Sequence, residues 1–392
     1  MAKTLADLDF KDKRVLVRVD FNVPLDENRQ ITSDARIRAA LPTIRAILDA
    51  GGRPVLMSHL GRPKGQVVES MRLRPAGERL GELLNVAVRY CEYCIGDNAI
   101  NASKALQEGE VLVIENLRFH ADETVGDKEF AAALAKLGDV YVNDAFGTAH
   151  RAHASVAGVP RHLPSAAGLL MEKELAAFAK LLRSPDRPVL AILGGAKVSD
   201  KLPVILNLLD KVDSILVGGA MAYTFLRQQG LEIGNSLCED HLIDAAAEAC
   251  AVAEAKGVKL LLPVDHVCAA AFEADAECSV HGPEIPAEQM ALDIGPETVA
   301  LYCEEISKAK TIVWNGPMGV FEMEAFRKGT EAVARAVAKA DAWTLVGGGD
   351  SVAAAELLGI TDAMDHVSTG GGASLELLEG KQLPGVTALE SN

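Results

Sequence analysis

The sequence predicts an α/β protein with two Rossmann-like parallel-sheet domains that face each other across a cleft and are joined by a helix. Short runs rich in β-branched residues alternate with helical segments along most of the chain, a pattern typical of parallel sheets. The length of 392 residues is long for one core and indicates two or three domains. Near the middle, Pro164, Pro185 and Pro188 bracket one helical segment, as expected at a junction.

Composition narrows the classes of protein that fit. Hydrophobic residues make up 49% and aromatic residues 4%, which suits an Ala/Val/Leu-rich core and argues against disorder. The net charge of -16, with no long basic tract, disfavours nucleic acid and anionic membranes as partners. No signal-peptide core and no run of 18 apolar residues occurs, so we expect a cytoplasmic protein. Its seven cysteines should be reduced, and Cys91-Glu-Tyr-Cys94 lacks the second pair of a zinc site.

In the first half, each predicted strand leads through a polar loop to a helix. The predicted strands are Arg14–Val19, Pro54–Ser58, Val111–Glu115 and Val140–Asn143, and the predicted helices are Ile37–Leu48, Ala76–Leu84 and Lys128–Leu137. Ser33 or Asp34 is available to cap the first helix. Parallel sheets bind ligands at the carboxyl ends of their strands, so the loops after these strands are the candidate site.

Three of these loops carry cationic side chains. They contribute His59, Arg62, Arg118, His150, Arg151 and His153, and Arg36 opens a helix nearby. A single arginine is usually a solvated surface charge, but several at strand ends in an acidic chain favour a focused anion site. Arginine binds phosphate and carboxylate through paired hydrogen bonds, so we expect a small ligand with both groups. Asp20 and Asn22 could bind its hydroxyl groups.

The segment Pro160–Pro188 is interpreted as a junction. Apolar residues within Met171–Leu182 have helical spacing. We therefore expect a first domain at 1–170, a connecting helix and linker at 171–187, and a second domain at 188–370. The alternative is a helix that merely packs on one domain.

In the second half, glycine replaces arginine at the strand ends. The predicted strands are Val189–Leu193, Ser214–Val217, Lys259–Leu262, Thr311–Trp314 and Trp343–Val346, and the predicted helices are Leu202–Leu209, Leu242–Lys256, Arg327–Lys339, Val352–Leu358 and Ser374–Leu378. Glycine-rich strand ends with few cations suit a nucleotide, whose polyphosphate binds backbone amides while a metal ion neutralises its charge.

Three stretches of this half could contact phosphate. Leu193-Gly-Gly-Ala-Lys-Val-Ser-Asp-Lys201 reads as strand, glycine turn and helix, and its two lysines could share an anion if both lie in the first helical turns. Asp350 follows three glycines and could hold Mg²⁺. The amides of Thr369-Gly-Gly-Gly-Ala373 would suit a phosphoryl group in transfer. The alternatives are a turn with two solvated lysines, and Asp350-Ser351 as a helix cap.

Several kinase and dehydrogenase signatures are absent. There is no G-x-x-x-x-G-K-[ST], no G-x-G-x-x-G after a strand, and no His-Arg-Asp triplet. An anion-binding half and a nucleotide-binding half still indicate phosphoryl transfer between two bound ligands.

Taken together, the loops resemble those of phosphoglycerate kinases. The matching motifs are Arg18-Val-Asp-Phe-Asn-Val-Pro24, Ser58-His-Leu-Gly-Arg-Pro-Lys-Gly65, Glu115-Asn-Leu-Arg-Phe119, Asn143-Asp-Ala-Phe-Gly-Thr-Ala-His-Arg-Ala-His-Ala-Ser155, Leu193 to Lys201, Trp314-Asn-Gly-Pro-Met-Gly-Val-Phe-Glu322, Gly347-Gly-Gly-Asp-Ser351 and Thr369-Gly-Gly-Gly-Ala-Ser374. They span nearly the whole chain in the family's order. Ala220 and Ser351 stand where glycine and threonine are common in the family.

The resemblance implies reversible, Mg²⁺-dependent transfer of a phosphoryl group from 1,3-bisphosphoglycerate to ADP in glycolysis, with ATP and 3-phosphoglycerate as products. It implies a hinge-bending monomer whose segment 379–392 packs on the first domain. The implied glycerate ligands are Asp20, Asn22, Arg36, His59, Leu60, Gly61, Arg62, Arg118 and Arg151. The implied nucleotide ligands are Lys197, Lys201, Asn315, Glu322, Gly347, Gly348, Gly349, Asp350 and Ser351, with Asp350 on the metal. The implied catalytic groups are Arg36, Lys197, Gly371 and Gly372.

Two other hypotheses fit part of the sequence. A two-lobed binding protein could close on an anionic metabolite without reaction, but it would not need Lys197, Asp350 and Glu322 on the second lobe. A kinase that forms a different acyl phosphate would use the same arginines with another carboxylate.

Overall fold

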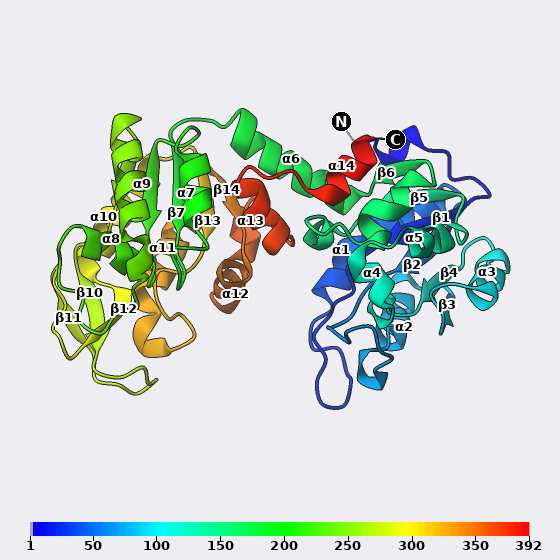
Figure 1. Cartoon of the computed structure of the whole chain (residues 1–392), viewed down its shortest axis with the longest axis horizontal. Coiled ribbons are helices and arrows are strands. Elements are labelled where there is room, and N and C mark those ends of the chain that lie inside the picture. The colour runs from blue at the N-terminus through cyan, green and yellow to red at the C-terminus, as the bar shows by residue number, and fades with distance from the viewer. Residues whose placement is uncertain (1–2, 392) are drawn as a thin grey trace. The chain divides into compact units, whose positions relative to one another are not determined.

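The computed structural model describes residues 3–391, which form two compact units. The first unit contains the chain up to Ala176 together with the segment from Gln382 on, and the second unit is Ala177–Lys381. Helix α6, Leu169–Arg183, begins in the first unit and ends in the second (Figure 1). No helix among the described residues is long and apolar enough to cross a bilayer.

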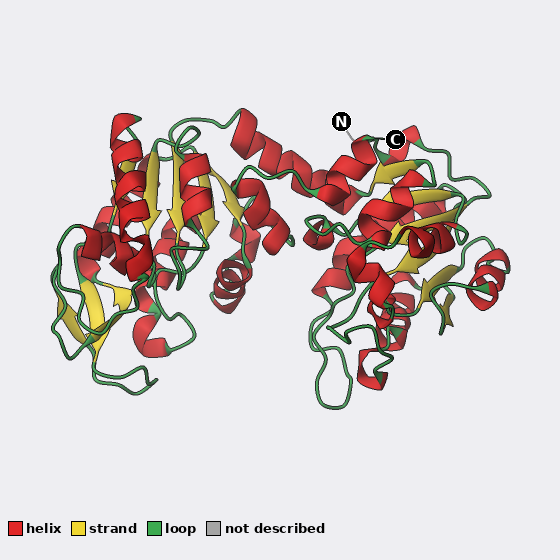
Figure 2. Ribbon diagram, viewed as in Figure 1, coloured by secondary structure: helices red, strands yellow, loops and turns green. Residues whose placement is uncertain are grey.

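The first unit contains a six-stranded parallel sheet in the order β3-β4-β2-β1-β5-β6. Its strands are β1 Arg14–Arg18, β2 Arg53–Met57, β3 Val88–Cys91, β4 Val111–Ile114, β5 Val140–Asn143 and β6 Ser165–Ala167. Its helices are α1 Ala35–Asp49, α2 Arg74–Leu84, α3 Asp97–Lys104, α4 Ala121–Val125, α5 Lys128–Ala135 and α14 Pro384–Glu390. Helices cover the sheet (Figure 2).

The burial of β1 explains why its sequence is a continuous apolar run. Val15, Leu16 and Val17 are all fully buried, because a central parallel strand packs against helices on both faces. Ile37 and Ile44 of α1 are fully buried in the same core as Val15 and Val17. The charged Arg18 follows them at the carboxyl end of the strand.

The second unit contains another six-stranded parallel sheet, in the order β15-β14-β13-β7-β8-β9. Its strands are β7 Val189–Leu193, β8 Ser214–Val217, β9 Lys259–Leu261, β13 Thr311–Asn315, β14 Trp343–Val346 and β15 His366–Val367. Its helices are α7 Leu202–Leu208, α8 Ala222–Gln228, α9 Ile243–Ala255, α10 Pro296–Lys308, α11 Lys328–Lys339, α12 Gly349–Leu357 and α13 Gly372–Leu378. The predicted α/β class with two parallel sheets is confirmed.

Several elements were not predicted. They include the edge strands β3, β6 and β15, helices α3, α8, α10 and α14, and a three-stranded antiparallel sheet. The strands of that sheet are β10 His266–Ala269, β11 Ser279–His281 and β12 Met290–Ile294. These strands are only three to five residues long, and β11 has no buried residue, so no long apolar run marks them.

The predicted cap of α1 is confirmed in position only. Asp34 occupies the N-cap position, but no side chain caps the helix there. The Asp34 carboxylate instead accepts hydrogen bonds from Arg38 Nε at 2.8 Å and Arg79 Nη2 at 2.7 Å, which ties α1 to α2. Ion pairing with two guanidinium groups is the stronger use of a carboxylate at this position.

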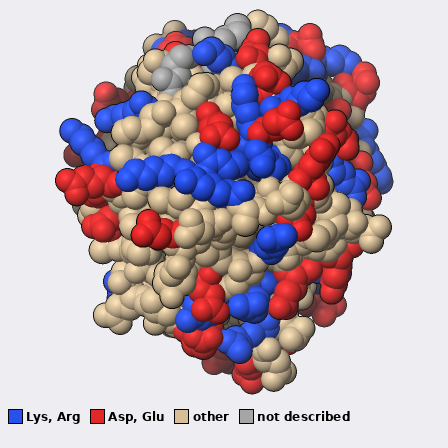
Figure 3. Space-filling view, turned by 90° about the vertical axis from the view of Figure 1, so that its right-hand side faces the viewer, with Lys and Arg blue, Asp and Glu red and all other residues tan. Residues whose placement is uncertain are grey.

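The segment from Gln382 on folds against the first unit. Gly385 N donates a hydrogen bond to Ala149 O at 2.8 Å, and Leu389 of α14 is fully buried. On the face drawn in Figure 3, several Lys and Arg side chains form a band across the upper middle, with Asp and Glu side chains around it and large areas of uncharged residues. The excess of acidic residues is therefore mixed with basic residues on this face.

Candidate active site

The cations predicted from the first half lie at the strand ends of the first unit. His59 and Arg62 follow β2, Arg118 follows β4, Arg151 lies beyond β5, and Arg36 is in the first turn of α1. These strands neighbour one another through β1 in the sheet, so their carboxyl ends lie along one edge. Arg62 and Arg151 are exposed, and neither side chain makes a hydrogen bond or ion pair within residues 3–391.

The loop after β1 connects two of the other predicted site segments. Asp20 Oδ2 accepts a hydrogen bond from Arg36 Nη1 at 2.7 Å. Asn22 Oδ1 accepts a hydrogen bond from Gly61 N at 2.8 Å, and Asn22 N donates to Asp20 Oδ1 at 3.1 Å. The Arg36 side chain stays 42% exposed, so a ligand can reach it while Asp20 orients it.

Asn116 holds two site loops together and was not predicted as a site residue. Its buried Oδ1 accepts from Leu60 N at 3.2 Å and from Arg118 N at 3.1 Å. Its Nδ2 donates to Leu60 O at 2.7 Å and to Met71 O at 2.8 Å. Arg118 Nη1 also donates to Gly61 O at 2.8 Å. A fully satisfied buried amide of this kind fixes the relative position of the loops that it bonds.

The electrostatics of this edge are those of an anion site. Burial, followed by the charges of Arg18, Arg118 and Arg36, holds the pKa of His59 well below its usual range. Burial and nearby cations lower the pKa of His153 to about 4. Burial also lowers the pKa of Arg118, with Arg18 as the next cause. Both histidines are therefore neutral at pH 7, and the positive charge comes from arginines.

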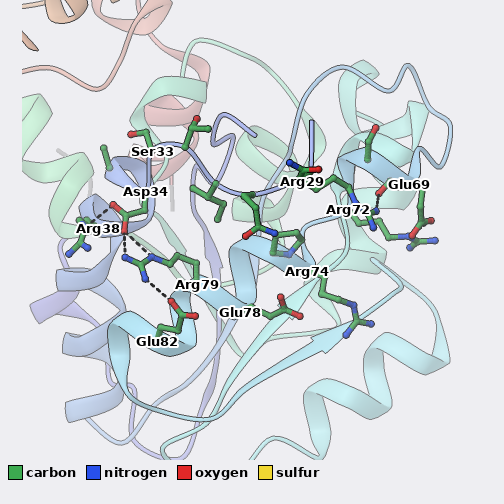
Figure 4. A pocket seen from close by; sticks show the side chains of 17 residues that line it. Arg29, Ser33, Asp34, Arg38, Glu69, Arg72, Arg74, Glu78, Arg79 and Glu82 are labelled. Atoms are coloured by element: carbon green, nitrogen blue, oxygen red, sulfur yellow. Dashed lines mark hydrogen bonds and ion pairs between the residues drawn. The ribbon is translucent and has the colours of Figure 1, made fainter. Parts of the chain in front are cut away.

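A large cavity of the first unit lies elsewhere. It has a volume of about 1040 Å³ and is lined by the loop 28–35, residues 69–74 and α2 (Figure 4). Several of its charged side chains are paired with each other, for example Arg79 with Asp34 and Glu82. None of the predicted site residues lines it, so cavity size alone does not locate the anion site.

In the second unit, glycines let the strand-end turns touch one another. A Cβ at Gly194 would lie 2.0 Å from Pro317 O, and one at Gly316 would lie 2.0 Å from Gly194 O. These two glycines are required for contact between turns, and not only for ligand approach. By contrast, nothing within 4 Å would meet a Cβ at Gly349 or Gly371, so backbone is accessible there.

The two lysines of the glycine turn differ in environment. Helix α7 begins at Leu202, so Lys197 and Lys201 both precede it, and they do not share a helical face as the sequence suggested. Lys197 is exposed. Lys201 donates a hydrogen bond to Asn315 Oδ1, and burial lowers its pKa to about 8, although Asp200 and Asp350 oppose the shift. The Asn315 Nδ2 donor is buried without a partner and faces the turn at Gly348.

The alternative in which Asp350 or Ser351 caps the helix after β14 is wrong. Gly348 occupies the N-cap position of α12, so neither Asp350 nor Ser351 caps that helix. Ser351 Oγ accepts a hydrogen bond from Gly316 N and so joins two turns. Asp350 is exposed.

A mainly apolar cavity of about 560 Å³ adjoins these turns. Its lining includes the predicted residues Glu322 and Asp350 and the glycine turn at Gly195. The apolar walls were not predicted, and they include Tyr223, Leu237, Phe272, Met290, Leu292, Met318 and Phe321. An apolar cavity with carboxylates and a glycine turn in its lining suits a ligand with a flat apolar part and a polar part.

The acidic residues of this region fit a magnesium ion that arrives with its ligand. Within residues 3–391, no group of three or more His, Cys, Asp or Glu side chains could hold a metal ion by itself. Mg²⁺ is commonly bound by one or two carboxylates together with waters and substrate phosphates. Asp350 offers one exposed carboxylate, which is enough for a magnesium ion bound in this way. Cys91 and Cys94 are buried thiols whose pKa is raised, mainly by burial, so they do not act as a thiolate site.

Comparison with known proteins decides the family. A family description, phosphoglycerate kinase, matches residues 5–381. The chain belongs to the phosphoglycerate kinase family. A phosphoglycerate kinase of Moorella thermoacetica is 58% identical over 391 residues, 99% of each chain, and one of Roseiflexus sp. is 57% identical over 390 residues, covering 99% of this chain and 98% of the other.

Solved phosphoglycerate kinases have the same fold. The structure from Coxiella burnetii superposes with a TM-score of 0.91 at 42% identity, covering 100% of this chain and 99% of that one. The structure from Pyrococcus horikoshii gives a TM-score of 0.85 at 36% identity, over 99% and 98% of the two chains. The chain is therefore a kinase, as predicted.

Within this phosphoglycerate kinase fold, contacts join some of the predicted residues in two clusters. In the first unit, Asp20, Asn22, Arg36, Gly61 and Arg118 are joined by hydrogen bonds, and His59 lies beside Asp20. In the second unit, contacts join Lys201, Asn315 and Gly348. Among the described residues, no side-chain hydrogen bond or ion pair joins Lys197 to either cluster. The buried Arg18 stands in a quoted motif, but nothing in a strand sequence distinguishes a buried arginine from an exposed one.

Proposed function

We propose that this kinase transfers a phosphoryl group reversibly between 1,3-bisphosphoglycerate and Mg-ADP, giving 3-phosphoglycerate and ATP. The observation that carries the proposal is the chemical contrast between the two clusters. Arginines and neutral histidines line the strand ends of the first unit, while a lysine, glycine turns and an apolar cavity lie at those of the second. A small polyanion suits the first cluster, and an adenine nucleotide suits the second.

The glycerate ligand would be held in the first unit. Arg62, Arg118 and Arg151 offer guanidinium donors to the phosphate and carboxylate groups. Asp20 and Asn22 would bind a hydroxyl group of the ligand, and His59 would donate a hydrogen bond. Backbone at Leu60 and Gly61 would line the ligand, because Asn116 and Asn22 hold that loop in place.

The nucleotide would be held in the second unit. The apolar cavity would take the base, Glu322 at its edge would bind the ribose, and Lys201 with Asn315 Nδ2 would bind phosphate oxygens. Backbone at Gly347, Gly348 and Gly349, with Ser351, would lie along the phosphates. Asp350 would hold the Mg²⁺, which neutralises phosphate charge when bound.

Catalysis would require little covalent chemistry from the protein. The attacking oxygen is already ionised in both directions, so no general base is needed, and alignment with charge neutralisation lowers the barrier. Arg36, Lys197 and the amides of Gly371 and Gly372 would stabilise the phosphoryl oxygens in transfer. Because these groups belong to different units, in-line transfer requires the units to close and exclude water. The resemblance to the family implies that the protein is a monomer. We also expect it to be cytoplasmic.

A coupled assay tests the proposal. We expect ATP-dependent phosphorylation of 3-phosphoglycerate that disappears with EDTA and returns with Mg²⁺. Acetate and other simple carboxylates, tested in parallel, should be poor acceptors because they lack the phosphate that the arginines bind. No turnover of 3-phosphoglycerate would refute the proposal, and faster turnover of another carboxylate would identify a different acyl-phosphate kinase. Equilibrium binding without turnover would indicate a binding protein.

A further inference from the structure

Arg18 is an unusual residue because it is fully buried at the end of the central strand β1. No carboxylate lies within ion-pair distance of its side chain among residues 3–391. Its Nε donates to Ser155 Oγ at 2.9 Å, its Nη1 donates to Val19 O, and its Nη2 lies 3.2 Å from His59 Nδ1. Burial of an arginine is costly unless its donors are satisfied, and each of its three nitrogens has a partner here.

The contact with His59 determines which ring nitrogen carries the proton. A guanidinium group has only donors, so His59 Nδ1 must accept the hydrogen bond. A neutral imidazole that accepts at Nδ1 carries its hydrogen on Nε2. Within the described residues, the His59 side chain makes no other hydrogen bond, so the Nε2–H group is available to a ligand.

Two further buried side chains hold Arg18 in place. Ser155 Oγ, which accepts from Arg18, donates to Glu123 Oε1 at 2.5 Å, and Ser155 N donates to Glu123 Oε2 at 2.9 Å. Glu123 is fully buried, and its negative charge offsets the cost of burying the positive charge of Arg18. Hydrogen bonds thus connect four side chains in sequence, from Glu123 through Ser155 and Arg18 to His59 at the anion site.

The other charged groups around His59 favour its neutral form. Arg36, Arg118 and His153 lie near enough to act on it electrostatically, together with Arg18. Among residues 3–391, Asp20 is the one carboxylate within ion-pair distance of His59, with Oδ1 at 4.0 Å from Nδ1, and Arg36 already binds it. Burial and these cations lower the pKa of His59 well below its usual range.

We infer that Arg18 is a positioning residue that fixes His59 as the Nε2–H tautomer, so that His59 donates a hydrogen bond to the anionic acceptor. The inference rests on the proposed function for the identity of that ligand. Glu123 and Ser155 act through Arg18, since they hold its guanidinium group against Nδ1. Without Arg18, the ring would be free to place its hydrogen on Nδ1 and face Asp20, leaving an acceptor where the ligand needs a donor.

The first test needs no activity. In the full-length protein with ¹⁵N-labelled histidine, long-range ¹H–¹⁵N spectra report the tautomer of each ring, and the His59 signals are those lost in His59→Gln. We expect a neutral Nε2–H ring that does not titrate between pH 5.5 and 9. A Nδ1–H ring, or a ring that titrates near pH 6.5, would overturn the inference even if the enzyme phosphorylates 3-phosphoglycerate. The expected tautomer in a protein without that activity would refute only the proposed function.

The second test perturbs the positioning residue. In Arg18→Lys the charge stays but the bond to Nδ1 is lost, so we expect Nδ1–H signals to appear and His59 to titrate at higher pH. The KM for 3-phosphoglycerate should rise about tenfold, as for the loss of about one hydrogen bond to an anion, while kcat changes less. Arg14→Lys, at the other end of β1 in a pair with Asp139, is the matched control and should change neither the tautomer nor this KM.

A second variant covers the case in which Arg18→Lys does not fold. Ser155→Ala removes the hydroxyl between Arg18 and Glu123 and should shift the His59 tautomer in the same direction with a smaller rise in KM. An unchanged His59 spectrum in a folded Arg18→Lys or Ser155→Ala protein would show that Arg18 is merely structural, and would overturn the inference.

Discussion

The two units share a topology of six parallel strands but differ in what stands at the strand ends. In the first unit, these positions carry arginines whose charge is permanent. The partly buried Asp20 carboxylate holds the Arg36 side chain, and the buried Asn116 side chain holds the backbone of Arg118. In the second, they carry glycines, an apolar cavity and Lys201, whose pKa burial lowers to about 8. The same scaffold thus places several fixed positive charges at the strand ends of one unit and few at those of the other.

The difference follows from the proposed ligands. A small acid with few atoms must be recognised by fixed charges, so its site is built from side chains with buried supports. A nucleotide offers a large apolar surface and brings Mg²⁺ with it, so backbone amides and an apolar wall suffice. The comparison therefore predicts that changes at the binding residues of the first unit alter the KM for 3-phosphoglycerate, and that those of the second unit alter the KM for nucleotide.

The largest effect is expected at Arg36. Arg36→Ala should lower kcat by about 10²- to 10³-fold, because a donor to the charge that develops in transfer is lost. The KM for ATP should change little, since the residue belongs to the first unit. Steady-state kinetics of the purified variant give both constants, and an equal loss in both would contradict the assignment. Arg38→Ala, one half turn further along α1 and paired with Asp34, is the matched control and should remain close to the parent protein.

Lys197→Ala should also lower kcat, by about 10²-fold, without loss of the fold, because the side chain is exposed in a strand-end turn. Circular dichroism and thermal melting should match the parent protein. A melting temperature lowered by many degrees would instead identify Lys197 as a structural lysine. Lys256→Ala, which removes a surface lysine paired with Asp210, controls for the change of charge in the same unit.

The pH dependence of substrate affinity should separate the units. The pKa of Lys201 is lowered to about 8, so its positive charge is present below that pH and is lost as pH rises through it. The KM for nucleotide should therefore rise by up to about tenfold between pH 7 and 9, equivalent to about 1.4 kcal/mol. The KM for 3-phosphoglycerate, bound by arginines, should stay nearly constant. Lys201→Arg should remove the rise, and a nucleotide KM that still rises in that variant would point to another group.

The smallest expected effect is on the pH dependence of Tm, and it comes from a buried aspartate that each unit contains. Burial raises the pKa of Asp144 in the first unit and of Asp293 in the second to about 7, from 3.8. A carboxyl group with a raised pKa in the folded state stabilises that state while protonated, and this stability is lost as pH rises from about 4 through 7. Asp144→Asn or Asp293→Asn should therefore reduce the fall in Tm between pH 5 and 8, with a shift of about 2–4 °C per kcal/mol.

Asp139→Asn is the control for this last prediction, because the pKa of Asp139 is lowered and Arg14 is its partner. Asp139→Asn should lower Tm at pH 8, whereas Asp144→Asn and Asp293→Asn should raise it there relative to pH 5. If both buried carboxyl variants melt with an unchanged pH profile, neither group titrates in that range.

The sequence predicted the central strands and the strand-end loops because those features are local. β5, β8 and β14 match their predicted bounds, since buried parallel strands are short apolar runs bounded by turns. Features made by distant residues were not predictable. Arg18 and Ser155 are 137 positions apart, and the apolar cavity combines Tyr223, Leu237 and Phe272 from separate segments. Their roles depend on packing, which no local pattern encodes.

The path of the chain has a consequence for synthesis. The second unit is one uninterrupted stretch, whereas the first is completed only by residues from Gln382 on, with Gly385 fitted so closely that a Cβ there would lie 3.0 Å from Ala149 Cα. On the ribosome, the second unit can finish folding as soon as it emerges. The first must wait while the intervening residues are made, about 10–40 s at about 5–20 residues per second. The unit made first is therefore the last to be completed, and Leu389 closes a core begun before the other unit existed.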